Sequence, residues 1–268
     1  MEKELKKIDS NELKKIQLEI LDVVASFCEK NKINYWLDCG TLLGAIRHKG
    51  YIPWDDDIDL GMLRIDYDKF MSLFNKKNKR YKAYSIENKC DFPFSFCKVL
   101  DTNTILYEPN KNGNKLSVNI DVFVYDNSPK SELVTKLLFK KRNIYHKLYL
   151  IQTRYTDNKN FIQKILINFL SFFLIPLPKN FYIKKIANFS KKYKNIENDY
   201  VSCLCGYDDV CIKKKCFKSF EKTIFENKKY KIPVGYDEVL KTFYGNYMEY
   251  PPKEEQISHH KFEAYYKK

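Results

Sequence analysis

The feature that most constrains this chain is a run of acids that leads directly into an apolar stretch, PWDDDIDL at residues 53–60. Side chains on an extended strand alternate between its two faces, so Asp57 and Asp59 should point the same way and Ile58 the opposite way. Two carboxylates held this close repel each other, and a divalent cation between them would relieve the repulsion. Because oxygen ligands suit Mg²⁺ or Mn²⁺, we expect these two aspartates to bind a metal ion; an acidic surface turn is the alternative.

A further acid is embedded in an apolar strand later in the chain, in VNIDVF at residues 118–123. An ionised carboxylate buried there is unfavourable unless it is paired, so Asp121 needs a partner. The metal ion expected at Asp57 and Asp59 is one such partner, and a structural salt bridge is the rival interpretation. Carboxylates that surround Mg²⁺ on neighbouring strands are typical of a phosphoryl-transfer site, in which Asp121 is the preferred general base.

A glycine-containing stretch, GTLLGAIRHKG at residues 40–50, lies just before the acid run. We expect Gly40 and Thr41 to form a turn that opens a short helix, because the free N–H groups at such a helix start suit a phosphate. The cations that follow can add positive charge around a diphosphate: Arg47, His48 and Lys49.

Four other residues are candidates for contact with a substrate. Lys98, on a strand expected at 95–100, is a candidate for contact with donor phosphates, although a solvated lysine is the preferred interpretation. His260 is a second candidate for the base, although a structural role is the preferred interpretation for a lone histidine near a terminus. Asp55 and Asp56 complete the acid run and are counted among the substrate-binding residues.

The pattern of apolar residues predicts an α+β protein: a mixed β-sheet with flanking helices rather than a regular βαβ alternation. We find no internal repeat or linker, so we expect one domain over residues 1–268 with a basic helical insertion at about 130–200. Ser10 is the expected N-cap of the first helix, and Gly245 should end the last one. Helices are expected at 11–31, 42–47, 66–74 and 236–244, and strands at 35–37, 58–63, 81–86, 95–100, 117–125, 201–207 and 216–220.

The net charge is +14, and most of it lies in one segment. Residues 130–192 contain 14 Lys and Arg but only two acids, which accounts for +12 of the total. This indicates either an anionic partner or a solvated basic face. A nucleic-acid-binding module would also be basic, but it leaves the placed carboxylates unexplained, so we expect no nucleic acid.

The most apolar stretch of the chain, residues 161–178, lies inside the basic segment. Its apolar run is too short to span a bilayer. A peripheral helix at a membrane interface and an ordinary buried helix are both compatible with this pattern. The charged N-terminus, MEKELKKIDS, lacks the apolar core of a secretory signal, so we expect a cytoplasmic protein, peripheral at the inner face of the plasma membrane if the interfacial interpretation holds.

Eight cysteines are present, and we expect them to be reduced. Four of them could supply thiolates to zinc, although they lack a CxxC pair and buried free thiols are the preferred interpretation. These four are Cys203, Cys205, Cys211 and Cys216.

The stretches at 40–50 and 51–59 together resemble the LicD/fukutin family, and NIDVF at 119–123 resembles its later acidic strand. A C-terminal block also matches, so the resemblance covers most of the chain except roughly 130–200. That block comprises PVGYDEVL at 233–240, YGNY at 244–247 and the paired prolines at 251–252. The family pattern has an arginine shortly after those prolines, whereas this chain reads KEEQISHH at 253–260.

The resemblance implies a nucleotidyltransferase-type fold and phosphotransfer from a CDP-activated alcohol such as CDP-choline. It implies that Asp57, Asp59 and Asp121 are the metal-binding acids and that Gly40 and Thr41 open the helix. Bacterial members move phosphocholine onto surface glycans such as lipopolysaccharide or teichoic acid, and eukaryotic relatives move ribitol phosphate. Choline is therefore implied by the resemblance and not by any residue of this chain.

We therefore expect a Mg²⁺-dependent transferase that moves phosphocholine to a sugar hydroxyl of a glycan or a lipid-linked precursor, with release of CMP. Transfer of phosphoethanolamine, glycerol phosphate or ribitol phosphate is the alternative within the same chemistry. Nucleotide transfer from a nucleoside triphosphate is the alternative from another class, and it would release pyrophosphate.

Overall fold

The computed structural model of the protein describes residues 5–107, 115–156, 159–174, 176–258 and 263–267. Its helices and strands form an α+β structure, as the sequence predicts, around a seven-stranded mixed sheet. The central and longest strand is β8 (Asn119–Asn127), which runs parallel to β3 (Asp59–Leu63). The other strands of this sheet are β2 (Trp36–Leu37), β4 (Tyr81–Tyr84), β5 (Cys97–Asp101), β9 (Tyr200–Ser202) and β10 (Cys211–Lys213).

Strand β8 is shared along its length. Its first half pairs antiparallel with β5 and its last residues pair antiparallel with β9, both on the edge away from β3. Strand β2 lies antiparallel on the outer side of β3. There Trp36 lies opposite Gly61, and a Cβ at Gly61 would lie 2.3 Å from the Trp36 ring, so only glycine permits this close pairing.

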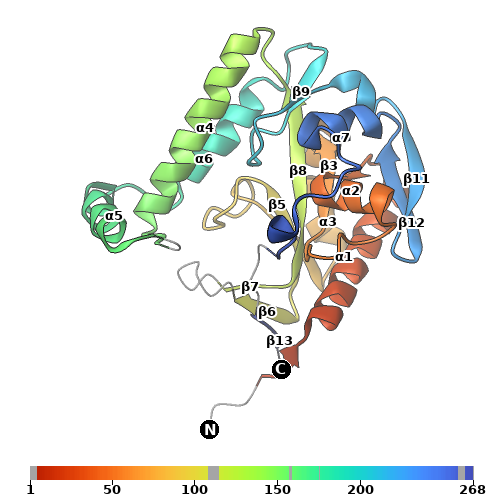
Figure 1. The fold of residues 1–268 in the computed structure, drawn as a ribbon, viewed down its shortest axis with the longest axis horizontal. Helices are drawn as coiled ribbons and strands as arrows, with labels where there is room; N and C mark the ends of the chain where they lie inside the picture. Colours follow the sequence, from red (N-terminus) through yellow and green to blue (C-terminus); the bar gives the residue numbers. More distant parts are fainter. Residues whose placement is uncertain (1–4, 108–114, 157–158, 175, 259–262, 268) are drawn as a thin grey trace.

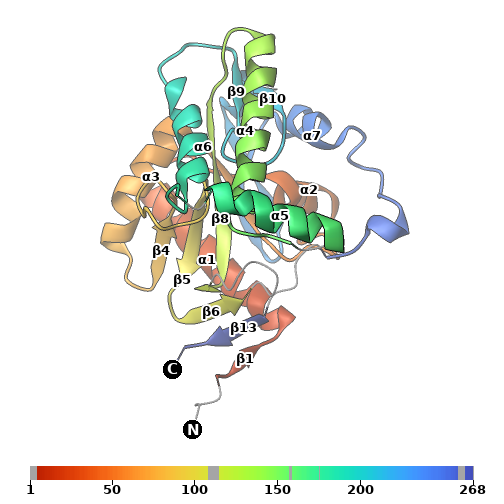
Figure 2. The ribbon, with the colours of Figure 1, turned by 90° about the vertical axis from the view of Figure 1, so that its left-hand side faces the viewer.

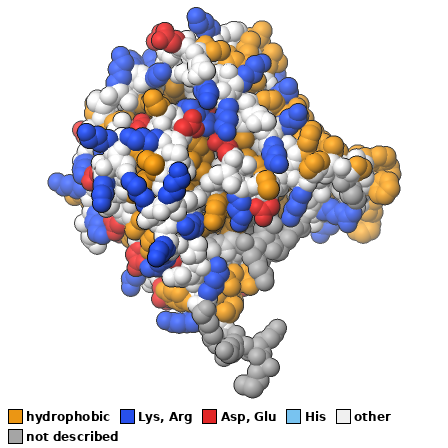
Figure 3. All heavy atoms as spheres, turned by 180° about the vertical axis from the view of Figure 1, so that it is seen from behind, with side chains coloured by type: hydrophobic (Ala, Val, Ile, Leu, Met, Phe, Trp, Pro, Cys, Tyr) orange, Lys and Arg blue, Asp and Glu red, His pale blue; other side chains and the backbone are white. Residues whose placement is uncertain are grey.

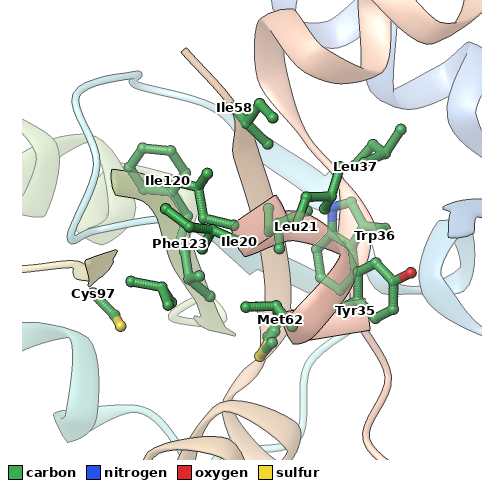
Figure 4. Packing of buried hydrophobic residues seen from close by; sticks show 14 of the residues in the cluster. Ile20, Leu21, Tyr35, Trp36, Leu37, Ile58, Met62, Cys97, Ile120 and Phe123 are labelled. Atoms are coloured by element: carbon green, nitrogen blue, oxygen red, sulfur yellow. The ribbon is translucent and has the colours of Figure 1, made fainter. Parts of the chain in front are cut away.

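The main core lies between this sheet and the helices that cover it. Figure 4 shows Ile20 and Leu21 of α1 (Ser10–Lys30) among residues of the sheet such as Met62 and Ile120. Each of these side chains is fully or almost fully buried. Burial of one such side chain contributes roughly 1.5–3 kcal/mol, so this core is the main source of stability for the elements that carry the acids. The other covering helices are α2 (Cys39–Arg47), α3 (Arg64–Lys77) and α7 (Tyr236–Tyr244).

Two smaller sheets complete the strands. The chain ends meet in one of them, where β13 pairs with both β1 and β6, a pairing that the sequence did not predict (Figure 2). The first sheet contains β1 (Lys7–Ile8), β6 (Thr104–Tyr107), β7 (Lys115–Leu116) and β13 (Glu263–Tyr266), and the second is the hairpin of β11 (Phe220–Phe225) and β12 (Lys228–Pro233). Short 3₁₀ helices lie at η1 (Lys214–Phe217) and η2 (Lys253–Glu255).

Several local predictions require correction. Asp9, and not Ser10, is the N-cap of α1, because its carboxylate accepts a hydrogen bond from the Glu12 N–H at 2.8 Å. Gly40 and Thr41 lie within the first turn of α2 and not in a turn before it. The strand expected at 201–207 ends at residue 202. The strand expected at 216–220 is wrong except at its last residue, because η1 covers its start and β11 begins only at Phe220. Gly245, with φ of 63°, ends α7 as predicted.

Residues 130–200 are largely helical, as predicted. They form α4 (Glu132–Gln152), α5 (Phe161–Leu174) and α6 (Phe181–Lys192). Helices α4 and α6 pack side by side, and α5 lies across the end of α4 (Figures 1 and 2). A second, smaller core of buried side chains joins α4 and α6: Ile86, Tyr149, Tyr182, Ile183, Ile186 and Ala187.

Candidate active site

The structure brings the three predicted acids into one cavity. Asp59 begins β3 and lies directly opposite Asp121 in the parallel β3–β8 register. Asp57 lies two residues earlier, in the segment without regular secondary structure that leads into β3. All three line a cavity of about 250 Å³ at this end of the sheet.

Burial makes this group of acids electrostatically unfavourable. Asp59 is 8% exposed, and its burial raises the pKa of its carboxyl well above the usual range. The charges of Asp57 and Asp121, and more weakly those of Asp55 and Asp38, raise the same pKa further. A cation in the cavity would remove this penalty, so the chemistry of Asp57 and Asp59 fits a divalent metal ion.

The third acid has a partner of a different kind. The Lys98 ammonium lies 2.5 Å from Oδ1 of Asp121 and 3.1 Å from the side-chain oxygen of Asn119. The interpretation of Lys98 as a solvated lysine is therefore wrong, since its side chain is only 10% exposed and lies over the ring of Phe94. In the part of the chain that the structure describes, no three acidic, histidine or cysteine side chains are arranged to hold a metal ion.

Helix α2 positions the acidic segment through its first turn. The hydroxyl oxygen of Thr41 accepts the backbone N–H of Asp59 at 2.8 Å, and the N–H of Asp38 donates to the Asp59 carbonyl at 2.9 Å. A Cβ at Gly40 would lie 2.7 Å from Oδ2 of Asp55, so glycine leaves room for that carboxylate. Cys39, the first residue of α2, lines the cavity, so the N-terminal end of the helix lies at the site.

The remaining acids of the run contact the surrounding chain. The Asp55 carboxylate accepts the N–H of Asp56 at 3.1 Å. The Asp56 carboxylate accepts a hydrogen bond from the Ser258 hydroxyl at 2.9 Å, and its carbonyl accepts one from Gln17. These contacts join the acid run to α1 and to the C-terminal part of the chain.

The basic residues at the end of α2 and just after it lie away from the carboxylate cavity. The Arg47 guanidinium donates to the carbonyl oxygens of Tyr247 and Glu249 at 2.8 and 2.9 Å and to the His48 ring at 3.0 Å. Arg47, His48 and Lys49 do not line the carboxylate cavity. Arg47 instead holds the C-terminal block against α2. His260 lies outside the described residues.

A fourth acid at the cavity was missed by the sequence analysis. Asp208 lines the cavity together with Tyr207, in the loop that follows β9. Arg142 of α4, which is 2% exposed, donates to the carbonyl oxygens of Gly206, Tyr207 and Asp208 and pairs with the Asp209 carboxylate. One arginine of the basic segment therefore holds this loop, and no short-range pattern could have indicated it.

A second missed acid is Asp38, which is fully buried beneath the start of α2. Its carboxylate accepts a hydrogen bond from the Tyr125 hydroxyl at 2.8 Å. Burial raises the pKa of Asp38 to about 6, and the hydrogen bond from Tyr125 opposes that shift.

A larger and more apolar cavity, of about 300 Å³, adjoins the carboxylate cavity. Phe94 and Tyr207 line both cavities. The rest of the apolar cavity lies between α4, α6, the segment before β5 and the loop after β9, with His146, Tyr149 and Ile183 among its lining residues. The helices of the basic segment therefore form one wall of a space that opens beside the acids.

The eight cysteines are all described by the structure, and most of them are buried. All eight are free thiols, and Cys203, Cys205 and Cys216 are buried. The sulfur atoms of Cys203 and Cys205 lie 3.4 Å apart, while Cys211 lies beside Ser128. Cys211 is only partly buried, so the interpretation as buried free thiols fits three of the four candidates. Among the described residues, the four are not brought together as one group of metal-ligating side chains.

The site is an acid-lined cavity in a mixed sheet, at the start of a helix. Comparison with known proteins gives the family. The family model described as LicD/FKTN/FKRP, nucleotidyltransferase domain, matches residues 32–156. The chain is 34% identical over 269 residues to the lipopolysaccharide cholinephosphotransferase LicD of Haemophilus influenzae, which covers 97% of this chain and 99% of that protein. The chain belongs to the LicD family.

Two other relatives match over shorter stretches. An uncharacterized protein of Rickettsia typhi is 40% identical over 91 residues, which is 31% of this chain and 29% of that protein. The ribitol 5-phosphate transferase FKRP of Homo sapiens is 51% identical over 39 residues, which is 15% of this chain and 8% of that protein. The similarity to the eukaryotic protein is therefore local.

Proposed function

We propose that this protein is a phosphotransferase that moves phosphocholine from CDP-choline to a sugar hydroxyl of a cell-surface glycan or of its lipid-linked precursor, and releases CMP. The name of the Haemophilus relative, a lipopolysaccharide cholinephosphotransferase, supports the phosphocholine group and the glycan acceptor, because the similarity extends over almost the whole of both chains. The family model, described as a nucleotidyltransferase domain, supports a nucleotidyltransferase-type fold. We further propose that the protein acts at the cytoplasmic side of the membrane.

The observation that carries the proposal is the pairing of Asp59 with Asp121 across two parallel strands, with Asp57 in the same cavity. We propose that Asp57 and Asp59 hold Mg²⁺, which often binds proteins through one or two carboxylates and takes further ligands from substrate phosphates. When bound, Mg²⁺ would neutralise the charge of the diphosphate and of the departing CMP.

The chain's own groups would complete the site. The N-terminal end of α2 would orient donor phosphates through its backbone N–H groups, since Cys39 at that end lines the cavity. Asp121 would accept the proton of the acceptor hydroxyl. Lys98 would hold the Asp121 carboxylate in place through their 2.5 Å contact.

In this reaction the acceptor oxygen forms a bond to the phosphorus that carries choline. The bond from that phosphorus to the bridging oxygen of CMP breaks, and CMP leaves with the electron pair. The proton of the hydroxyl moves to Asp121. The apolar cavity beside Phe94 and Tyr207 would receive the acceptor, because aromatic rings such as those of Tyr149 and Tyr207 can pack against sugar faces.

Ribitol phosphate is a second candidate for the transferred group, because the local match to FKRP favours it. A direct experiment separates the candidates: purified protein is incubated with Mg²⁺, a lipopolysaccharide acceptor and CDP-choline, CDP-ribitol or CTP, and the nucleotide products are measured. We expect CMP from CDP-choline. Pyrophosphate from CTP without CMP from either CDP-alcohol would instead identify a nucleotidyltransferase.

Substitution of the proposed metal-binding acids tests the same proposal at the site. Asp57→Asn and Asp59→Asn should each reduce CMP release by about a thousandfold or more, because each removes a charged ligand. Asp91→Asn is the matched control, since Asp91 is exposed and does not line the cavity. Near-normal turnover of either cavity variant at saturating Mg²⁺ would refute the assignment.

A further inference from the structure

Helix α5 is oriented with its apolar side outward. Six large apolar side chains of this helix are 55–78% exposed, whereas Ser171 is the buried residue of the helix. At 3.6 residues per turn the six fall within an arc of roughly 120°, and Ser171 lies on the opposite side. The six are Phe161, Ile162, Ile165, Phe169, Phe172 and Phe173.

This orientation is fixed by contacts with the end of α4. The Arg154 guanidinium donates to the Ser171 hydroxyl at 3.2 Å. The Gln152 side-chain amide donates to the carbonyl oxygens of Leu174 and Leu177 at 3.2 and 3.0 Å. The polar contacts therefore lie on the inner side of α5. A helix that covers the core of a globular protein has the opposite arrangement, with its apolar face inward. The interpretation of this segment as a buried helix is wrong.

The charge around α5 indicates what covers its apolar face. Three exposed lysines lie on α5 or in the chain next to it: Lys159, Lys164 and Lys179. Figure 3 shows the hydrophobic side chains gathered on the protruding right-hand edge of the molecule, with Lys and Arg side chains beside them. A second copy of this chain would bring the same positive charges together, whereas an anionic lipid surface complements both the lysines and the apolar face.

We propose that α5 docks this protein onto an anionic membrane surface, with the face of Phe161, Ile162, Ile165, Phe169, Phe172 and Phe173 in the lipid and the flanking lysines at the headgroups. The helix has 14 residues, which corresponds to about 21 Å and is shorter than the roughly 30 Å hydrocarbon layer. Among the described residues, no helix is long and apolar enough to cross a bilayer. The helix therefore lies along the surface.

Docking through α5 would place the apolar cavity near the lipid. The end of α4 that holds α5 also lines this cavity, through Tyr149, Leu150 and Thr153. The cavity in turn shares Phe94 and Tyr207 with the carboxylate site. This consequence rests on the proposed function: a lipid-linked acceptor could approach the acids without leaving the membrane. The docking itself requires neither donor nor acceptor.

Vesicle binding tests the proposal directly. The full chain is sedimented with phosphatidylcholine vesicles that contain or lack phosphatidylglycerol, at low and at high salt. We expect binding to the anionic vesicles at low salt and release at high salt. Failure to bind anionic vesicles at low salt would overturn the proposal, whether or not the protein releases CMP from a donor.

Matched variants locate the contact. Phe172→Ser with Phe173→Ser should weaken partitioning by about tenfold or more, because it removes two side chains from the apolar face. Ile65→Ser with Ile257→Ser is the control, since both isoleucines are exposed but lie outside α5. Lys164→Glu with Lys179→Glu should weaken binding and reduce its salt dependence, whereas Lys229→Glu with Lys253→Glu should not.

A second readout covers the possibility that the serine variant does not fold. Phe172→Trp keeps an aromatic side chain on the surface and should show a blue-shifted fluorescence spectrum when anionic vesicles are added. Unchanged fluorescence with vesicles would count against docking through this face. A stable dimer that the serine pair converts to a monomer, together with no vesicle binding, would show that a second copy covers the helix.

Discussion

The two ends of β8 each carry a buried or partly buried aspartate, and the two aspartates have different partners. Near the C-terminal end of β8, Asp126 is fully buried and binds Arg64 through both carboxylate oxygens, at 2.7 and 2.8 Å. Near the N-terminal end of β8, Asp121 contacts Lys98 and shares its cavity with Asp57 and Asp59. The planar guanidinium of Arg64 neutralises Asp126 through two hydrogen bonds. At Asp121, in contrast, the described lining of the cavity contains more acids than cations. A buried carboxylate on one strand can thus serve stability at one end and chemistry at the other.

The largest effect should come from the Asp121 end. Asp121→Asn should reduce CMP release by about a hundred- to ten-thousandfold while donor binding survives, because the amide cannot accept the proton. The melting temperature should change little. Steady-state kinetics with donor titration and a thermal melt give both quantities, and parallel losses of stability and activity would show that Asp121 is only structural.

The opposite result is expected at the other end of β8. Asp126→Asn should lower the free energy of unfolding by about 3 kcal/mol, because it leaves the buried Arg64 without its main counterion. This value is at the low end for a broken buried pair, since Asp68 and Glu87 also contact Arg64 at 3.2 and 3.4 Å. Urea unfolding measures the change. Activity per folded molecule should stay close to that of the unchanged protein, and a selective loss of turnover would break the comparison.

A smaller effect is expected from Lys98, the cation near the N-terminal end of β8. Lys98→Met should reduce turnover by about tenfold with little change in the KM for the donor, because Lys98 contacts Asp121. Lys82→Met is a matched control on the neighbouring strand, where the ammonium donates to the carbonyl oxygens of Asn75 and Asn78. A rise in the KM for the donor with unchanged turnover would instead place Lys98 on the donor phosphates.

Much of the sheet could be predicted because its signals are local. The strands around Lys98 and Asp121 and the helix that ends at Gly245 follow from apolar periodicity and from turn chemistry. The N-cap of α1 was misplaced by one residue, since Asp9 and Ser10 are both common capping residues and only geometry separates them. The strand β13 was missed because its partners, β1 and β6, lie far away in the sequence.

The sequence by itself determined the acid motif, the prediction that Asp57 and Asp59 point the same way and the apolar stripe of α5, because alternation along a strand and periodicity along a helix are local properties. Only the tertiary structure decided the partners. Lys98 meets Asp121 because β5 and β8 pair in one particular register. The stripe of α5 faces outward because Arg154 and Gln152 hold its polar side against α4. Periodicity fixes which residues share a face, but the direction of that face depends on contacts between distant segments.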